Sequence, residues 1–213
     1  MSRPSSRSIA DDRLDSELAA QIGATDFRAL DLHAPLDAAA QIADTPPDKA
    51  AKGMFLEQLA HSARKLGVPC ETRYVPFRDY PLRDFMQLQA EYARALYPRL
   101  PARDAFRRVG WEAFSTLISS VAGRVLYSFA SGGGVQGALR LAPQAYKQTL
   151  THCSVTVRLC TPHQVVLEYR DVWNFADCYH VGVVEGACRA FGAEPRVRAR
   201  VLSRCDVDLL IRW

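Results

Sequence analysis

The last third of the chain alternates apolar and polar residues in short runs that turn-forming residues separate. Residues 153–160 and 164–170 flank one such turn, and residues 196–202 and 207–213 flank another. An alternation with a period of two predicts β-strands, and connections this short predict hairpins.

Between the two predicted hairpins, apolar residues recur at helical spacing over residues 173–191, and Gly192 ends the run. The pattern predicts a β-β-α-β-β module over residues 153–213. Gly182 and Gly186 lie four residues apart, on one face of this helix. Because glycine weakens a helix interior by about 0.5–1 kcal/mol relative to alanine, the pair indicates that another backbone approaches closely. That backbone belongs either to the sheet or to a partner subunit.

The chain upstream of this module is predicted to be mainly helical, because its apolar residues recur at helical spacing between prolines and glycines. Helices are expected over residues 14–22, 52–66, 82–97, 104–121, 124–129 and 135–150. Residues 24–51 are expected to be irregular, as a linker or as an arm laid over the body. We expect residues 1–24 to form a flexible segment with a short helix. Residues 25–213 are expected to form a single α+β domain, with N-terminal helices packed on the C-terminal antiparallel module.

The composition is that of a globular protein, since 48% of the 213 residues are hydrophobic. No apolar run approaches the roughly 18 residues of a transmembrane helix, and the basic start lacks the apolar segment of a secretory signal. We therefore expect a cytoplasmic protein with no membrane span. In that compartment cysteines are expected to be reduced thiols rather than a disulfide framework. The six are Cys70, Cys153, Cys160, Cys178, Cys188 and Cys205.

Positive charge is concentrated in the middle of the chain, where residues 97–150 carry seven Lys and Arg against two Asp and Glu. Such a region either attracts an anionic ligand, nucleic acid or lipid head groups, or forms a solvated helix face. No aromatic residues interleave the basic ones in a nucleic-acid-binding motif. We expect a solvated face and no nucleic-acid partner.

The cysteines, histidines, serines and glycines do not have the spacing of known metal-binding, nucleophilic or phosphate-binding motifs. Cys178 and His180 are two residues apart, so on a helix they point about 200° apart and do not chelate one ion. No Cys-x-x-Cys pair, Gly-x-Ser-x-Gly elbow or phosphate-binding loop with a Gly-Lys-Ser/Thr ending is present. The sequence predicts neither a metal site nor catalytic residues, and the chain is expected not to be an enzyme.

An ordered set of short motifs resembles a myxobacterial paralogous family of uncharacterised proteins, over roughly residues 25–213. The motifs are Lys52-Gly-Met-Phe55, Asp79-Tyr-Pro-Leu-Arg83, Ala95-Leu-Tyr-Pro98, Gly123-Arg-Val-Leu126 and Tyr179-His-Val-Gly-Val-Val-Glu-Gly186. That family is similar to a superfamily of haem-NO-binding domains, vinyl-4-reductase domains and Bet-three-type subunits of TRAPP complexes. The resemblance implies an α+β fold that is often dimeric. It does not imply one activity, because the superfamily binds haem, aromatic effectors, acyl chains or partner proteins.

The chain departs from the motifs that this resemblance would bring. Haem-NO-binding domains carry a Tyr-x-Ser-x-Arg motif that clamps the haem propionates, and Tyr127-Ser-Phe lacks the arginine. Of the vinyl-4-reductase cysteine cluster, only Cys205 has a counterpart. Cys70 stands where a Bet-three-type subunit carries its acylated cysteine, in a different local sequence. The resemblance therefore implies no cofactor, and leaves Cys70 as a candidate for acylation.

The sequence favours a non-enzymatic small-molecule sensor or adaptor domain, with a hydrophobic pocket between helices and sheet for a ligand of apolar or mixed polarity. The predicted ligand-binding residues are Phe85, Tyr92, Phe114, Arg124, Tyr127, Tyr146 and Trp173. The alternative is an interaction or scaffold module without a ligand, a homodimer that uses residues 173–191 or an exposed strand edge. A haem-binding or acyl-binding protein is less favoured.

Overall fold

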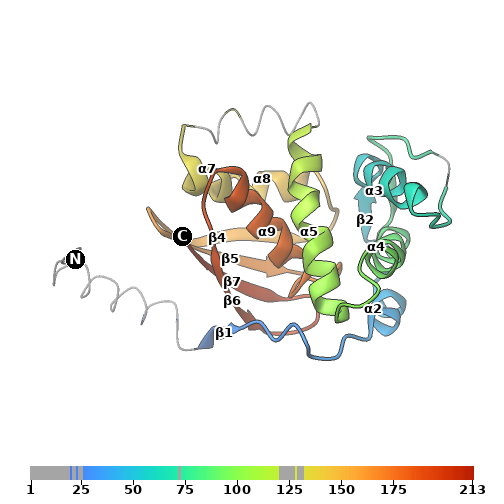
Figure 1. The fold of residues 1–213 in the computed structure, drawn as a ribbon. Helices are drawn as coiled ribbons and strands as arrows, with labels where there is room; N and C mark the ends of the chain where they lie inside the picture. Colours follow the sequence, from blue (N-terminus) through green and yellow to red (C-terminus); the bar gives the residue numbers. More distant parts are fainter. Residues whose placement is uncertain (1–19, 21–22, 24–25, 72, 120–127, 129–131) are drawn as a thin grey trace, which may run out of the picture.

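The computed structural model of the chain describes residues 26–71, 73–119 and 132–213, together with residues 20, 23 and 128. A five-stranded antiparallel sheet has helices on one face, and a second group of helices lies beyond them (Figure 1). This arrangement confirms the α+β class and the C-terminal β-β-α-β-β module. None of the helices in the described ranges is both long and apolar enough to cross a membrane.

The four predicted strands form, and they lie in the order β6-β7-β5-β4. Their bounds are β4 (Ser154–Thr161), β5 (Gln164–Arg170), β6 (Arg196–Val201) and β7 (Val207–Arg212). A fifth strand, β1 (Arg28–Ala29), pairs with β6 at the far edge. The expectation that residues 24–51 are irregular is therefore wrong at β1. The strand was not predicted because two residues are too few to show a periodic pattern.

Alternation along the strands separates two faces. On the inner face, Leu167, Tyr169 and Leu209 are completely buried beneath the helices. On the outer face, Val166 and Leu210 are also buried, because they pack against Phe27 just before β1. The N-terminal part of the described chain therefore covers part of the outer face.

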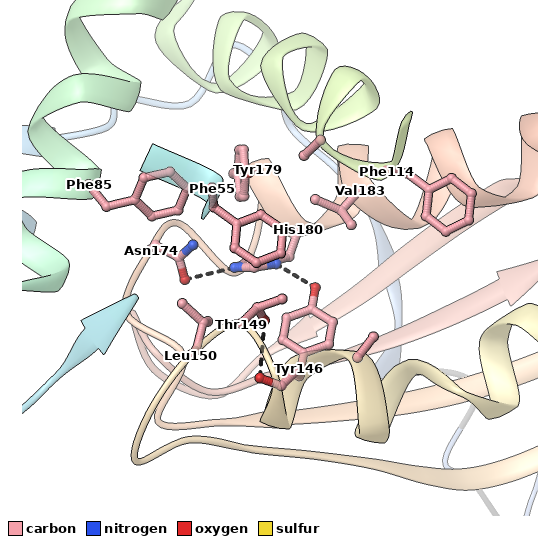
Figure 2. Close-up of a pocket in the computed structure, with 12 residues that line it drawn as sticks. Phe55, Phe85, Phe114, Tyr146, Thr149, Leu150, Asn174, Tyr179, His180 and Val183 are labelled. Atoms are coloured by element: carbon pink, nitrogen blue, oxygen red, sulfur yellow. Dashed lines mark hydrogen bonds between the residues drawn. The ribbon is translucent and has the colours of Figure 1, made fainter. Parts of the chain in front are cut away.

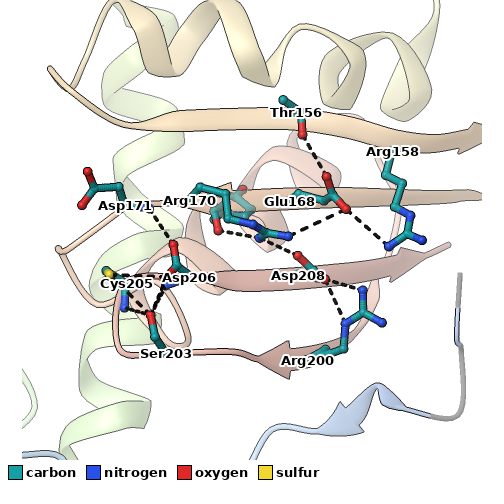
Figure 3. A network of polar contacts seen from close by, with 11 residues as sticks. Thr156, Arg158, Glu168, Arg170, Asp171, Arg200, Ser203, Cys205, Asp206 and Asp208 are labelled. Atoms are coloured by element: carbon teal, nitrogen blue, oxygen red, sulfur yellow. Dashed lines mark hydrogen bonds and ion pairs between the residues drawn. The ribbon is translucent and has the colours of Figure 1, made fainter.

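The rest of the outer face carries a network of ion pairs (Figure 3). The fully buried carboxylate of Asp208 lies between Arg170, at 2.6 Å, and Arg200, at 2.5 Å. On the neighbouring strands, Glu168 accepts a hydrogen bond from Thr156 and pairs with Arg158 at 3.4 Å. Two arginines thus neutralise Asp208, as burial of a charge requires.

Helix α9 (Tyr179–Ala190) is buried between the sheet and α5 (Ala102–Ser119) (Figure 1). A Cβ atom added at Gly182 would lie 1.8 Å from the Arg107 carbonyl oxygen of α5. One added at Gly110 of α5 would lie 2.1 Å from the Tyr179 carbonyl oxygen. The backbone whose close approach the glycine pair indicated therefore belongs to α5, and not to the sheet or to a partner subunit.

The predicted helix over residues 173–191 begins only at Tyr179. Phe175, with φ 61°, adopts the left-handed conformation that a right-handed helix excludes. Its side chain is fully buried and packs on Phe106 of α5, with ring centroids 4.0 Å apart. Residues 173–178 therefore form turns that bring Asn174 into the interior.

The predicted helix over residues 135–150 is two helices, α7 (Gly134–Arg140) and α8 (Ala142–Lys147). The break falls at Leu141, and Pro143 occupies the first turn of α8. Proline has no N–H to donate, and within a helix its ring would clash with the carbonyl of the residue four positions earlier. Pro143 therefore does not continue the first helix but lies in the first turn of the second.

The remaining helices form the outer layer of the helical side. Helix α3 (Gly53–Lys65) and helix α4 (Leu82–Leu96) agree with the prediction. Helix α2 (Ala38–Asp44) and the ribbon of β2 (Ala50–Lys52) and β3 (Asp79–Pro81) were not predicted. Gln41 of α2 donates a hydrogen bond to the Trp173 carbonyl, 2.7 Å away. Residues 38–52 therefore pack on the body, as an arm would.

Much of the basic charge of residues 97–150 is paired internally. Arg103 pairs with Asp177, Arg107 with Glu185, and Arg108 with Asp104. The prediction of a solvated helix face therefore describes the region only in part. Arg107 joins α5 to α9, and Arg103 joins α5 to the turns before α9.

Candidate functional site

A small cavity of about 60 Å³ lies between the helices, at the end of the domain where α3, α5, α8 and α9 meet (Figure 2). Its walls are mainly aromatic and aliphatic. They are formed by Phe55, Phe85, Ala113, Phe114, Ala145, Tyr146, Thr149, Leu150, Asn174, Tyr179, His180 and Val183. Apolar walls with a few polar groups are the usual composition of a small-molecule pocket.

A second cavity of about 40 Å³ adjoins the first and shares Phe55, Phe85, Ala113 and Tyr179 with it. Tyr92 lies in its wall and donates a hydrogen bond to Glu112, 3.1 Å away. Burial raises the pKa of Tyr92 to about 12, and the nearby carboxylate of Glu112 adds to the shift. The Tyr92 hydroxyl therefore stays protonated.

A hydrogen-bonded relay of three side chains forms the polar wall of the first cavity (Figure 2). Asn174 Oδ1 accepts from His180 Nε2, at 2.8 Å. With the proton on Nε2, Nδ1 is the acceptor for the Tyr146 hydroxyl, at 2.5 Å. Both ring nitrogens of His180 are thus engaged, and the imidazole is fixed in one tautomer.

The relay is neutral. Burial lowers the pKa of His180 to about 3, because charging the ring in a dry interior is unfavourable. Burial also raises the pKa of Tyr146 well above its ordinary value. The site therefore offers a molecule in the cavity neutral dipoles and no formal charge at neutral pH.

We expect the buried histidine to make the protein acid-sensitive. The unfolded chain binds a proton at His180 below about pH 6.5, and the folded protein binds it only near pH 3, so stability falls with decreasing pH in that window. The loss should be about 1.4 kcal/mol per pH unit. Between pH 6.5 and pH 5, the free energy of unfolding measured in urea should fall by about 2 kcal/mol less in H180Q than in the unsubstituted protein. H61Q, at an exposed histidine, is the matched control, and an equal drop in H180Q would contradict the prediction.

Two further buried side chains hold polar atoms with no hydrogen-bond partner among the described residues. They are the Tyr169 hydroxyl of β5 and both amide atoms of Gln89 on α4. Tyr169 packs edge-on against Tyr146, with ring centroids 5.3 Å apart. Neither residue lines either cavity, and each lies beside a tyrosine of the site, Tyr169 beside Tyr146 and Gln89 beside Tyr179.

The structure brings four of the predicted ligand-binding residues to these cavities. Phe85, Phe114 and Tyr146 line the first cavity, and Phe85 and Tyr92 line the second. Trp173 lies elsewhere, where its Nε1 donates to Asp171 at 2.6 Å. Arg124 and Tyr127 lie outside the described residues, and whether any of the seven binds a ligand stays a prediction.

Four polar residues of the first cavity were not among those predicted: Thr149, Asn174, Tyr179 and His180. The sequence places Tyr179 and His180 side by side at the start of a helix whose other residues are apolar or glycine except Glu185 and Arg189. A polar pair in a mainly apolar helix is the signal that could have identified them. Asn174 gave no such signal, because its position depends on the turns before α9.

The cysteines do not assemble into a metal site. All six are free thiols, and Cys178 and Cys188 are buried. In the part of the chain that the structure describes, no three His, Cys, Asp or Glu side chains are grouped to hold an ion. Cys70 packs on the core at the end of α3, with Sγ 3.7 Å from the Ala60 carbonyl oxygen. Acylation of Cys70 stays a prediction.

A family model described as a protein of unknown function, DUF2378, matches residues 46–213. The chain belongs to the DUF2378 family. The match covers α3, α4, α5 and the whole sheet module, but not β1 or α2. No curated protein matches the sequence. The myxobacterial membership expected from the motifs stays a prediction.

Solved structures of H-NOX proteins share the fold of this DUF2378 chain. The Fe(II) unliganded H-NOX protein from K. algicida is 15% identical, with a TM-score of 0.55 over 76% of this chain and 95% of that one. An H-NOX protein from S. oneidensis in the Fe(II)NO ligation state is 17% identical, with a TM-score of 0.53 over 76% and 98%. At these identities the likeness concerns the fold alone, which is of the α+β class that the sequence predicted.

The described residues do not fit a haem group. Of the five histidines, all of which lie in the described ranges, only His180 is buried, and the other four are exposed. Both ring nitrogens of His180 are hydrogen-bonded, to Tyr146 and to Asn174, so neither is available as an iron ligand. Cavities of 60 and 40 Å³ are far below the roughly 300–1,000 Å³ of pockets for larger ligands.

Proposed function

We propose that this DUF2378 chain is a non-enzymatic sensor domain that binds a small, mainly apolar molecule in the cavity beside the His180 relay. The observation that carries the proposal is the cavity itself, which lies between packed helices and ends on neutral hydrogen-bonded dipoles. The ligand is a molecule of a few heavy atoms, because 60 Å³ is well below the 150 Å³ or so of an apolar cavity that holds benzene.

The electrostatics of the site support binding rather than catalysis. A general acid or base works best with a pKa near the operating pH, and the pKa values of His180 and Tyr146 are displaced in opposite directions away from it. The relay is suited to hold a ligand and to register its presence by a change in the His180 hydrogen bonds. The adaptor role and the homodimer belong to the same proposal, since a sensor must pass its state to a partner.

Xenon tests the cavity directly, because it is an apolar atom that enters small dry cavities. We expect saturable ¹H–¹⁵N shifts under xenon pressure at the backbone amides of residues that line the cavity, such as Ala113, Val183 and Tyr179. The variant A113F fills the shared wall and should abolish the shifts, whereas A95F, at an exposed position on α4, should leave them unchanged. Shifts that persist in A113F would contradict the proposed site.

The natural ligand can be sought by native mass spectrometry of the purified protein. We expect an added mass of a small organic molecule, lost in A113F and retained in A95F. An added mass and absorption spectrum of haem would overturn the proposal, and so would a dimer that carries no ligand and shows no response to xenon.

A further inference from the structure

Strand β4 forms one edge of the sheet, and a groove of about 410 Å³ runs between its first half and helices α7 and α8. The strand side of the groove is residues 153–157. The helix side includes Arg140 of α7 and Lys147 of α8. A volume of this size lies within the roughly 300–1,000 Å³ of pockets that hold ligands.

The two edges of the sheet differ in how much backbone they leave open. The far edge ends in β1, which is two residues long. β4 has eight residues, and no strand in the described ranges pairs with its outer edge (Figure 3, where Thr156 marks β4). Natural proteins blunt such edges with short strands or bulges, and β4 has a bulge only after Val157. Residues 154–157 therefore keep an open row of backbone donors and acceptors beside the groove.

The charge of the groove selects its occupant. Arg140 and Lys147 are both exposed, and none of the nine residues that line the groove is acidic. Arg140 Nε lies 3.2 Å from Cys160 Sγ, a weak acceptor that leaves its charge uncompensated. A second copy of this chain that paired β4 with β4 would bring both cations of each copy into one groove, where like charges repel. An acidic segment would be attracted there.

From these observations we propose that the groove is a docking site for an extended acidic peptide of a partner protein, which adds a strand to the sheet at β4. Backbone hydrogen bonds to residues 154–157 supply affinity, and Arg140 and Lys147 select carboxylate side chains on the incoming strand. This is the β-augmentation mode of peptide recognition. The inference does not rest on the proposed sensor function, because the groove shares only Tyr146 with the cavity and the proposed peptide contacts are the β4 backbone, Arg140 and Lys147.

The test uses a fluorescein-labelled ten-residue peptide of alternating glutamate and valine, followed by fluorescence anisotropy. We expect saturable binding and slowed amide exchange at residues 154–157 by NMR. R140E/K147E should weaken binding at least about 10-fold. K65E/R99E carries the same change in net charge at exposed positions on the α3–α4 side and should bind as the unsubstituted protein does. If circular dichroism shows that R140E/K147E is unfolded, R140Q/K147Q replaces it.

Two further peptides separate strand addition from adsorption by charge. A lysine-valine peptide should not bind, because its charge has the same sign as that of the groove. A glutamate-valine peptide N-methylated on its four central residues should not bind either, because neither side of the extended peptide then keeps the backbone N–H groups needed to pair with β4. The proposal is overturned by equal binding of the N-methylated peptide, by an equal loss in K65E/R99E, or by absence of binding to the first peptide. A dimer in sedimentation that protects residues 154–157 would also overturn it, because a second copy would then occupy the edge.

Discussion

Substituting Gly182 by alanine should destabilise the protein strongly, although alanine is the better helix former. Helix propensity alone would make G182A more stable by about 0.5–1 kcal/mol. The added Cβ, however, would lie 1.8 Å from the Arg107 carbonyl oxygen and 2.7 Å from its carbonyl carbon. Both are backbone atoms of α5, so the two helices must separate and the core between them must open. We expect a loss of about 3 kcal/mol or more.

Thermal unfolding measures this effect. A loss of that size should lower the Tm by about 6–12 °C for a domain of this length. G132A is the matched control, because a Cβ there would meet no atom within 4 Å. A Tm for G182A equal to or above that of G132A would show that α5 and α9 do not pack as closely as described.

The strands and their faces were predictable from the sequence because each has enough residues to show a period. Leu167 and Tyr169 alternate with the polar Glu168 and Arg170 on β5, and the alternation is interrupted only by Val166, which packs with Phe27 on the outer face. The start of α9 was not predictable, because it depends on Phe175 adopting a positive φ so that its ring reaches Phe106. That contact joins segments about 70 residues apart, which no local pattern encodes.

The candidate site was predictable to the extent that it consists of aromatic residues on helices. Phe85, Tyr92, Phe114 and Tyr146 could be found because each lies in a helical run. The relay could not, since Asn174 and Tyr146 meet His180 only after the turns before α9 and the break before α8 have formed. The proline that breaks the helix was visible in the sequence, but its consequence for Tyr146 was not.

The second large effect is expected at Glu185, the buried carboxylate between α9 and α5. It is 2% exposed and accepts hydrogen bonds from Arg107 Nε at 2.7 Å, Arg107 Nη2 at 2.5 Å and Trp111 Nε1 at 2.7 Å. The hydrogen bond to Glu185 raises the pKa of Arg107, which stays charged. E185A would therefore leave a cation and an indole N–H without their acceptor, and should cost about 3–5 kcal/mol.

The double variant R107M/E185L tests whether the loss of stability in E185A comes from the unpaired charge of Arg107 or from the lost volume of the Glu185 side chain. Replacing both members of a buried ion pair by apolar residues of similar volume is often neutral or stabilising. In urea unfolding, the free energy of unfolding of R107M/E185L should therefore be well above that of E185A. The Arg189 guanidinium lies 4.6 Å from the centroid of the Trp111 ring and would still cover it in both variants. If the double variant is as unstable as E185A, the carboxylate contributes through its shape and its bond to Trp111 rather than through neutralising Arg107. A recovery would mean that the cost of E185A comes from leaving the Arg107 charge without its partner between α5 and α9, where Gly182 and Gly186 allow the two backbones to meet.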